Sequence, residues 1–525
     1  MKDVLKIAVV FLFWSCAQQA PLTGGIKDTI PPEIINFKSY PKNLSTNFQS
    51  NNIRIEFDEY IKLKNTSKNF FVNPPIENVA IKAANKSILI TINEELKAQT
   101  TYTFNFGSAI EDITEGNVLE DFKYVVSTGN YIDSNFFDGF AFDAFSKKPI
   151  ENTKIFLFEN LIDTFSKQIL PNYLSSAKED GSFSLKNLTN QPFYLVAFED
   201  ENDNNSFDYK TEKIGFLKEN IYPINKKDST VKPPTVLLFS PEKKLKLIDK
   251  KYLYPGKVLL LFNKKTASVS VTSAEKKLIV VNREYPSDSL EFWIDSISSK
   301  ILNATISSDF LDSAKTFSIT TSNPEKTDST FTFRAKNLSN LKPKEPLRLH
   351  FNHPISTIDT SKITLLKDSI AQPINFSFSA NLFSLFLPNG NTGTYNFDAL
   401  PGAFNSIYGF TNDSTTISIQ PKKSSDYGSI YFSVSVEDST NFICQVIKKN
   451  KVVKAFYCSN GLLKDTVQMC LPGNYNIRVI KDSDKDGAFS TGNFLQKKLA
   501  EQVLYYNQPI EIKAGWDVEI NWKIK

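Results

Sequence analysis

Three segments of the chain share a short strand pattern that ends in phenylalanine and runs into a polar turn. They are Ile53-Arg-Ile-Glu-Phe57, Val258-Leu-Leu-Leu-Phe262 and Leu347-Arg-Leu-His-Phe351. The first and third alternate strictly between apolar and polar residues, as a half-buried antiparallel strand does. After the first segment, further strand-like segments follow at 87–93, 100–106 and 122–128. Short strands at this spacing, separated by turn residues, predict an all-β fold of tandem antiparallel β-sandwiches.

A second repeat consists of a strand followed by an acidic turn. It occurs at 193–208 as FYLVAFEDENDNNSFD and again at 475–490 as YNIRVIKDSDKDGAFS. The acidic positions and the phenylalanine align without a gap, and a short strand with a Gly or Pro turn precedes each copy. The two repeats together therefore predict five sandwiches, three of one kind and two of another.

Length and composition agree with several β-domains. A chain of 525 residues is too long for one hydrophobic core. Proline recurs along the whole chain, and no long apolar segment has helical periodicity, which argues against a helix-rich fold. The net charge of +4 is spread thinly, so we expect no nucleic acid partner.

The N-terminal segment has the pattern of a signal peptide. Lys2 and Lys6 flank a short charged region, and the apolar run from Ile7 to Trp14 has the length of a signal-peptide core but is too short to span a bilayer. Residues 1–15 are therefore predicted to be removed. The Gly- and Pro-containing stretch up to residue 31 is predicted to be a flexible tether.

Several motifs resemble a family of bacterial lipoproteins built from Ig-like domains of the SbsA type. They are TGGIKDTIPPEI at 23–34, TYTFNFGSAIEDITEGN at 101–117, STG at 127–129 and DYGSI at 426–430. The segments 136–240 and 428–525 resemble sandwiches of the transthyretin-like, carboxypeptidase-regulatory type, with DGFAFDAFSKKPIENTKIFLF as an opening hairpin. The resemblance implies Ig-like domains at 32–129, 241–335 and 336–425, and a lipidated Cys16 at the start of a tether covering 16–31. An ordinary signal cleaved nearby is the alternative to lipidation.

The resemblance implies a non-catalytic role in the cell envelope, as a spacer, adhesion or assembly module. The predicted partners are the membrane, through the N-terminal lipid, and envelope proteins or glycans. A position on the outer membrane facing the periplasm is slightly favoured over the cell surface, because Ala-Gln-Gln-Ala after Cys16 contains no acidic cluster. Two alternatives remain open. One is a glycan- or peptide-binding surface module, and the other is a hydrolase whose site matches none of the common catalytic motifs.

The acidic turns are the best candidate binding sites. Calcium takes several oxygen ligands, and alternate side chains of a tight loop can converge on one ion. Asp482, Asp484 and Asp486, followed by Gly487, match the first half of an EF-hand-like loop, but Asn493 stands where the bidentate Glu would be. The earlier copy offers Asp200, Asn202, Asn204 and Asp208 with fewer charges. The alternative is that these turns are stabilised by Asp and Asn without an ion, so that the protein needs no cofactor.

Histidine and tryptophan are two further candidates for functional groups. His350 and His353 are the only histidines. Their spacing on a strand points them to opposite faces, so we expect a solvated strand end and no metal site. Trp293, Trp516 and Trp522 could line a glycan-binding face, but core packing is favoured for each.

The sequence leaves the pairing of Cys444, Cys458 and Cys470 open. A two-residue turn at Lys449-Asn450 predicts that Cys444 lies opposite Ala455. With that register Cys444 and Cys458 would face opposite sides of the sheet, so any disulfide would need Cys470. Three buried, unpaired thiols are the alternative.

Overall fold

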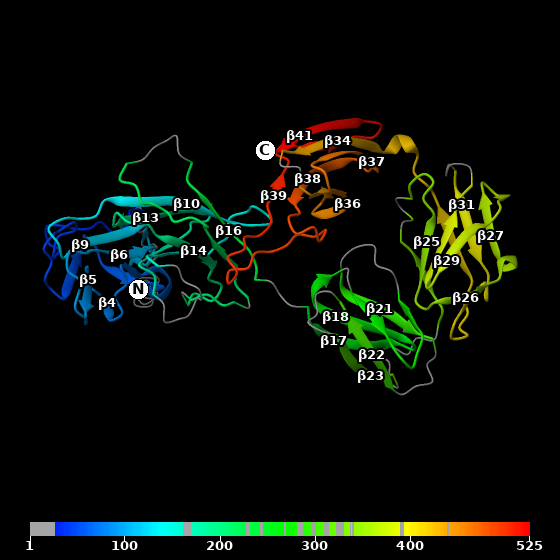
Figure 1. Ribbon diagram of the computed structural model, residues 1–525, viewed down its shortest axis with the longest axis horizontal. Helices are drawn as coiled ribbons and strands as arrows, with labels where there is room; N and C mark the ends of the chain where they lie inside the picture. Colours follow the sequence, from blue (N-terminus) through cyan, green and yellow to red (C-terminus); the bar gives the residue numbers. More distant parts are fainter. Residues whose placement is uncertain are drawn as a thin grey trace, which may run out of the picture. The chain divides into compact units, whose positions relative to one another are not determined.

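The structure is a computed structural model, and it describes residues 27–524 except 161–169, 205, 210, 227–231, 242–244, 267–268, 281–286, 296–300, 309–313, 322–329, 337, 339–340, 389–392 and 438–439. It divides into two compact units, Met1–Asp143 with Lys148–Leu238, and Ala144–Lys147 with Phe239–Lys525. Almost every regular element is a β-strand, and nearly all strand pairs are antiparallel, which confirms the predicted all-β fold (Figure 1). Residues 1–15 and Cys16 lie outside the described residues.

The first sandwich of the first unit is built from small sheets around one apolar core. The three sheets have the orders β1-β5-β4, β3-β6-β9 and β2-β7-β8. Their strands are β1 (Asn52–Glu56), β2 (Ile61–Leu63), β3 (Phe71–Asn73), β4 (Val79–Ala84), β5 (Ser87–Ile92), β6 (Thr101–Gly107), β7 (Ile110–Asp112), β8 (Val118–Leu119) and β9 (Phe122–Ser127), with one short helix, α2 (Thr66–Asn69). Ile53 and Ile55 of β1 point into the core, as the alternating pattern predicts.

A buried aspartate organises the loop between β7 and β8. Both carboxylate oxygens of Asp112 accept backbone N–H bonds, from Glu115 at 2.6 Å, Gly116 at 3.1 Å and Asn117 at 2.5 Å. The Asn117 side chain in turn donates to the carbonyls of Asp28 and Ile30. These bonds explain the IEDITEGN motif: it closes a tight loop and fastens the segment that enters the sandwich.

The second sandwich of this unit has two sheets, ordered β13-β10-β16 and β12-β11-β14-β15. Its strands are β10 (Asn135–Asp143), β11 (Thr153–Phe158), β12 (Tyr173–Ser176), β13 (Ser182–Leu188), β14 (Tyr194–Glu199), β15 (Ile214–Phe216) and β16 (Thr235–Leu238). The pair β10–β16 is parallel. Phe183, Leu185, Leu195 and Ala197 are among the buried side chains between the sheets.

The second unit begins with two further sandwiches. The first has the sheets β17-β18-β21-β20 and β19-β22-β23, and the next has β24-β25-β30-β29, β28-β27-β31-β33 and β26-β32. The strands of the first are β17 (Leu247–Tyr254), β18 (Lys257–Thr266), β19 (Ser270–Thr272), β20 (Leu278–Val280), β21 (Ser287–Ile294), β22 (Ile301–Ser307) and β23 (Lys315–Thr320). Those of the next are β24 (Phe333–Ala335), β25 (Leu347–Phe351), β26 (Ile355–Ile358), β27 (Ile363–Lys367), β28 (Ile370–Ala371), β29 (Asn375–Ser379), β30 (Leu382–Phe386), β31 (Tyr395–Ala399), β32 (Phe404–Ser406) and β33 (Thr415–Ile419), with a 3-10 turn η3 (Thr360–Lys362).

The last sandwich follows the 3-10 turn η5 (Ser424–Asp426) and has the sheets β37-β34-β41 and β36-β35-β38-β39, with β40 also paired to β38. Its strands are β34 (Gly428–Val436), β35 (Phe442–Lys448), β36 (Lys451–Cys458), β37 (Leu462–Cys470), β38 (Gly473–Lys481), β39 (Val503–Tyr505), β40 (Ile510–Ile512) and β41 (Asp517–Ile524). Both the strand orders and the one parallel pair, β34–β41, match the sandwich that contains β10–β16. The repeat seen in the sequence is thus a repeat of topology.

The register predicted for the cysteine hairpin is wrong by one residue. Lys449 and Asn450 do form the two-residue turn, both with positive φ. A β-bulge then shifts the register between Val446 and Ile447, so that Cys444 lies opposite Phe456 and Phe442 lies opposite Cys458. Cys444 and Cys458 therefore share a face, and with Cys470 they are buried in the same core as free thiols.

Two other expectations from the sequence are wrong. His353 does not lie at a solvated strand end: it follows β25 and is fully buried, with the rings of Tyr408 and Phe410 each 5.5 Å away between centroids. Trp516 is not in a core: it is 58% exposed in the turn before β41, and the ammonium of Lys513 lies 4.9 Å from its ring centroid. Both residues lie in turns next to a strand, so the alternation of side chains along a strand does not determine where they point.

None of the helices in the described part of the chain combines the length and apolar character that a membrane span requires.

Candidate metal centre

The acidic turn of the last sandwich leaves the central strand β38 at its C-terminal end. Asp482 comes directly after β38, is only 5% exposed, and donates its backbone N–H to the carbonyl of Asn441 at 2.9 Å. Lys485 and Gly487 have φ angles of 63° and 75°, and this left-handed backbone folds the turn back toward Asp482. The Gly487 N–H donates to Oδ2 of Asp482 at 3.1 Å, whereas Oδ1 is buried and has no hydrogen-bond partner among the described residues.

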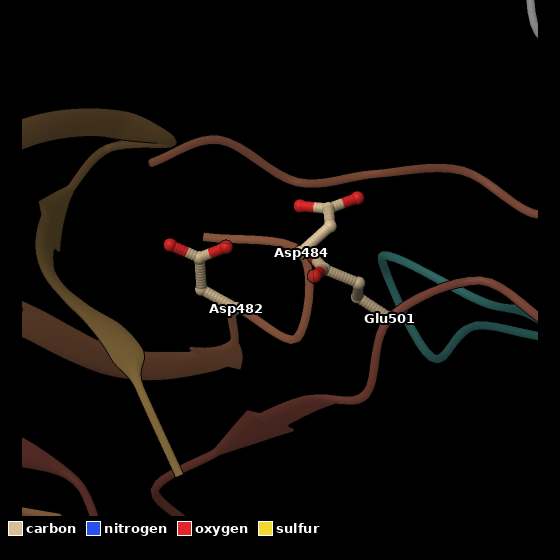
Figure 2. Close-up of side chains that lie close together, drawn as sticks. All are labelled: Asp482, Asp484 and Glu501. Carbon is tan, nitrogen blue, oxygen red and sulfur yellow. The ribbon is translucent and has the colours of Figure 1, made fainter. Parts of the chain in front are cut away.

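Three carboxylates converge at this turn. One oxygen each from Asp482, Asp484 and Glu501 lies within 4.8 Å of the others, and Figure 2 shows that Glu501 reaches them from a separate stretch of chain. Within the described residues, this is the one group of three or more His, Cys, Asp or Glu side chains whose ligand atoms lie so close together. Carboxylate oxygens in this arrangement are the ligands that Ca²⁺ prefers, and a buried oxygen without a partner is normally satisfied by water or an ion.

Glu501 also holds the turn together. Its Oε1 accepts the backbone N–H of Ser483 at 2.7 Å and its Oε2 accepts that of Ser490 at 3.0 Å. Burial raises the pKa of Glu501, and the charge of Asp484 raises it further, while the two backbone hydrogen bonds act in the opposite direction. The positive charge of a cation between the carboxylates would favour the ionised form of Glu501 and so act against this pKa rise.

The structure separates Asp486 from the other two predicted ligands. Oδ1 of Asp486 accepts the backbone N–H of Ala488 at 2.7 Å, and Oδ2 accepts the Ser490 hydroxyl at 3.3 Å, as in an Asx turn. Asn493 forms a small hairpin with Lys498 and accepts the N–H of Gln496 through its side chain. The predicted set of Asp482, Asp484 and Asp486 is thus replaced by Asp482, Asp484 and Glu501.

The earlier acidic turn follows β14 and is closed in the same way. Asp200 is fully buried, and its Oδ1 accepts the Asn204 N–H at 3.0 Å. Glu212 accepts the backbone N–H groups of Glu201 at 3.2 Å and Asp208 at 2.8 Å. These two donors align with Ser483 and Ser490 of the later turn, so Glu212 corresponds to Glu501.

The two turns differ in the number of carboxylates that lie near Glu212 in the earlier turn and Glu501 in the later one. Asn202 stands where the later copy has Asp484, and its Oδ1 accepts the Asn204 N–H at 3.2 Å. Asn204 accepts the Ser206 N–H at 2.7 Å, as Asp486 accepts that of Ala488. The earlier turn therefore has a similar hydrogen-bonded frame with fewer carboxylates. The frame thus forms without the carboxylate that Asp484 provides in the later turn.

Sequence reasoning missed both glutamates, although a signal exists. Each glutamate stands two residues before the strand that follows its turn, Glu212 before β15 and Glu501 before β39. That strand pairs with the strand that leads into the turn, β14 or β38. The loops between turn and glutamate differ by seven residues, because Asp208 and Glu212 are 4 apart and Ser490 and Glu501 are 11 apart. An alignment that ends at the shared phenylalanine therefore does not reach them.

Comparison with known proteins supports the fold of the first sandwich. Residues 28–128 match the family model described as bacterial Ig-like domain. No curated protein sequence is significantly similar to the chain.

Three solved structures show some likeness to the chain. The S-layer protein rSbsC(31-844) is 13% identical over 75% of this chain and 67% of its own, with a TM-score of 0.17. The Escherichia coli adhesin FdeC is 9% identical over 69% of this chain and 99% of its own, with a TM-score of 0.13. The BSP domain of a biofilm-associated protein is 9% identical over 89% of this chain and 97% of its own, with a TM-score of 0.13.

Proposed function

We propose that the chain is a non-catalytic spacer of the cell envelope, anchored through Cys16, whose last sandwich is stabilised by calcium. The observation that carries the proposal is that two pairs of consecutive sandwiches, one pair in each unit, are joined by specific hydrogen bonds between buried and half-buried groups. A flexible linker would leave the sandwiches free to turn. Joints of this kind instead transmit a fixed spacing from one sandwich to the next.

The joint in the first unit is a reciprocal pair of hydrogen bonds. The Asn73 side chain at the end of β3 donates to the carbonyl of Leu174 at 2.8 Å and accepts its N–H at 2.8 Å. Leu174 belongs to the edge strand β12, so Asn73 satisfies backbone groups that β11 leaves unpaired. Asn187 adds a second link, because it donates to the Asp133 carbonyl and accepts the Thr103 hydroxyl.

The joint between the first two sandwiches of the second unit is made of aromatic side chains. Trp293 is fully buried and donates Nε1–H to the carbonyl of Asn352 at 3.3 Å. The Tyr408 hydroxyl donates to the carbonyl of Ile294, and its ring packs against Gly256, where a Cβ would come within 2.2 Å of Cζ. Burial raises the pKa of Tyr408, as expected for a phenol removed from water. The buried His353 lies beside the same ring.

The amide of Leu174 is a direct reporter of the first joint, because its partner is a side chain of the neighbouring sandwich. In hydrogen exchange, we expect this amide to be protected and to exchange much faster in Asn73→Ala. Asn78→Ala, which removes an exposed asparagine of the same sandwich, is the control and should leave it protected. Equal exchange of Leu174 in all three proteins would contradict the proposal.

The anchor is tested independently. With Cys16 replaced by serine, the proposal expects the protein to leave the membrane fraction of its native host. A Cys16→Ser protein that stays in that fraction would rule out the lipid anchor without affecting the joints.

A further inference from the structure

A cavity of about 250 Å³ lies in the first unit, where the sheet β3-β6-β9 of one sandwich meets β12 and β13 of the other. Its ionisable lining consists of four lysines and one carboxylate: Lys68, Lys123, Lys178, Lys186 and Asp121. Serine and asparagine side chains provide most of the remaining polar lining, and Phe71 and Phe183 contribute aromatic rings. The cavity therefore combines excess positive charge with many hydrogen-bonding groups.

Two of the lysines are neutralised by carboxylates. Lys178 is paired with Asp121 at 2.7 Å, and Lys68 with Asp203 at 3.0 Å. Lys123 and Lys186 have no carboxylate within salt-bridge distance in the described part of the chain. Burial lowers the pKa of Lys123, and the charge of Lys186 lowers it further. The two ammonium groups thus repel each other at the wall of one cavity, the charge of Asp121 opposes this effect only in part, and a bound anion would relieve it further.

The walls of the cavity are fixed. The reciprocal bonds between Asn73 and Leu174 join β3 to β12, and the Lys154 ammonium donates to the carbonyl of Lys68 at 3.2 Å. The ion pair between Lys178 and Asp121 is a further link between the two sandwiches. A site held in this way requires little ordering when a ligand binds, which favours affinity.

We propose that this cavity binds a sugar that carries a phosphate or carboxylate group. The lysines Lys123 and Lys186 bind the charged group, and the serine and asparagine side chains bind hydroxyl groups. A volume of about 250 Å³ leaves room for one sugar ring and its charged substituent. Lysine binds phosphate and carboxylate as a point charge, so the chemistry of the two lysines admits either anion.

The test is calorimetric titration of the full chain at low ionic strength with glucose 6-phosphate, glucuronate and uncharged glucose. We expect one of the two anions to bind with a dissociation constant at or below the millimolar range, and glucose to bind at least tenfold more weakly. Binding of glucose 6-phosphate alone identifies a phosphorylated sugar, and binding of glucuronate alone a carboxylated one. If neither anion binds below about 10 mM, or if glucose binds equally well, the proposal is wrong.

Variants locate the site. Lys123→Gln with Lys186→Gln should weaken binding about tenfold or more, because each lysine supplies a charge-assisted hydrogen bond. The control is Lys82→Gln with Lys97→Gln, which removes the same total charge from exposed positions of the first sandwich outside the cavity. Equal weakening by both double variants would show a diffuse charge effect and overturn the assignment. The Leu174 amide exchange reports separately whether the joint is intact in the cavity variant.

Discussion

Replacing Asp482 with asparagine should change the stability of the last sandwich in opposite directions with and without calcium. In the ion-free protein, Asp482 lies within 4.8 Å of oxygens of both Asp484 and Glu501. Two unit charges at that separation repel by about 3 kcal/mol at an effective dielectric constant near 20, and solvent at the exposed edge reduces this to about 1 kcal/mol per pair. Asparagine can still accept the Gly487 N–H, so the ion-free variant should be more stable by about 1–2 kcal/mol.

Calcium should reverse the sign of the stability change that Asp482→Asn causes. A site of this type with a dissociation constant near 10⁻⁴ M would gain about 2.7 kcal/mol at roughly 10 mM calcium. The asparagine variant loses a buried carboxylate ligand and most of that gain. At 10 mM calcium it should therefore be less stable than the native protein by about 1 kcal/mol.

Hydrogen exchange of the segment 473–505 measures this locally, since a chain with several cores does not unfold in one transition. The matched control is Asp486→Asn, which removes the same charge from the same turn but from a carboxylate outside the cluster. It should change exchange little in either condition. A variant Asp482→Asn that shifts stability in the same direction with and without calcium, or that behaves like Asp486→Asn, would refute the site.

Three further predictions follow from the same contacts. Asn202→Asp gives the earlier turn the carboxylate that Asp484 provides in the later one, so calcium should then protect segment 194–216 from exchange, which a flat calcium response would contradict. Burial raises the pKa of the Cys444 thiol to about 12, so iodoacetamide should label it only after unfolding, as mass spectrometry can check. Burial raises the folded pKa of Glu501 above 4.5, so its contribution to ion-free stability is fully present below pH 4.5 and is lost as the pH rises through the folded pKa. Protons also compete with the ion, so calorimetry should find weaker calcium binding at pH 5 than at pH 7.

The strands could be predicted from the sequence because apolar and polar residues alternate along them, and this alternation shows which side chains are buried. Ile53 and Ile55 of β1, like Leu347 and Leu349 of β25, alternate with polar residues, and each pair is buried. The same rule failed beyond strand ends. His353 and Trp516 stand in turns, where the direction of a side chain depends on contacts made by distant segments.

The register predicted for the cysteine hairpin was wrong for a different reason. Its turn was identified correctly, but a bulge adds one residue to β36, and one residue moves every later side chain to the other face. The carboxylate cluster of the candidate metal centre could be predicted only in part. Asp482 and Asp484 follow from local spacing, whereas Glu501 comes from a loop of variable length and only the pairing of β38 with β39 brings it to the turn.

A distance measurement across the aromatic joint tests the spacer proposal most directly. Spin labels at Thr272→Cys in β19 and Thr364→Cys in β27, both exposed strand positions, can be introduced with Cys16 replaced by serine, because the three native thiols at the C-terminal end are buried. Pulsed dipolar spectroscopy should give one narrow distance distribution in this protein and a clearly broader one when Tyr408→Phe and Trp293→Phe are added. A distribution that is already broad without these two substitutions, and unchanged by them, would contradict the account of a chain whose joints fix its spacing.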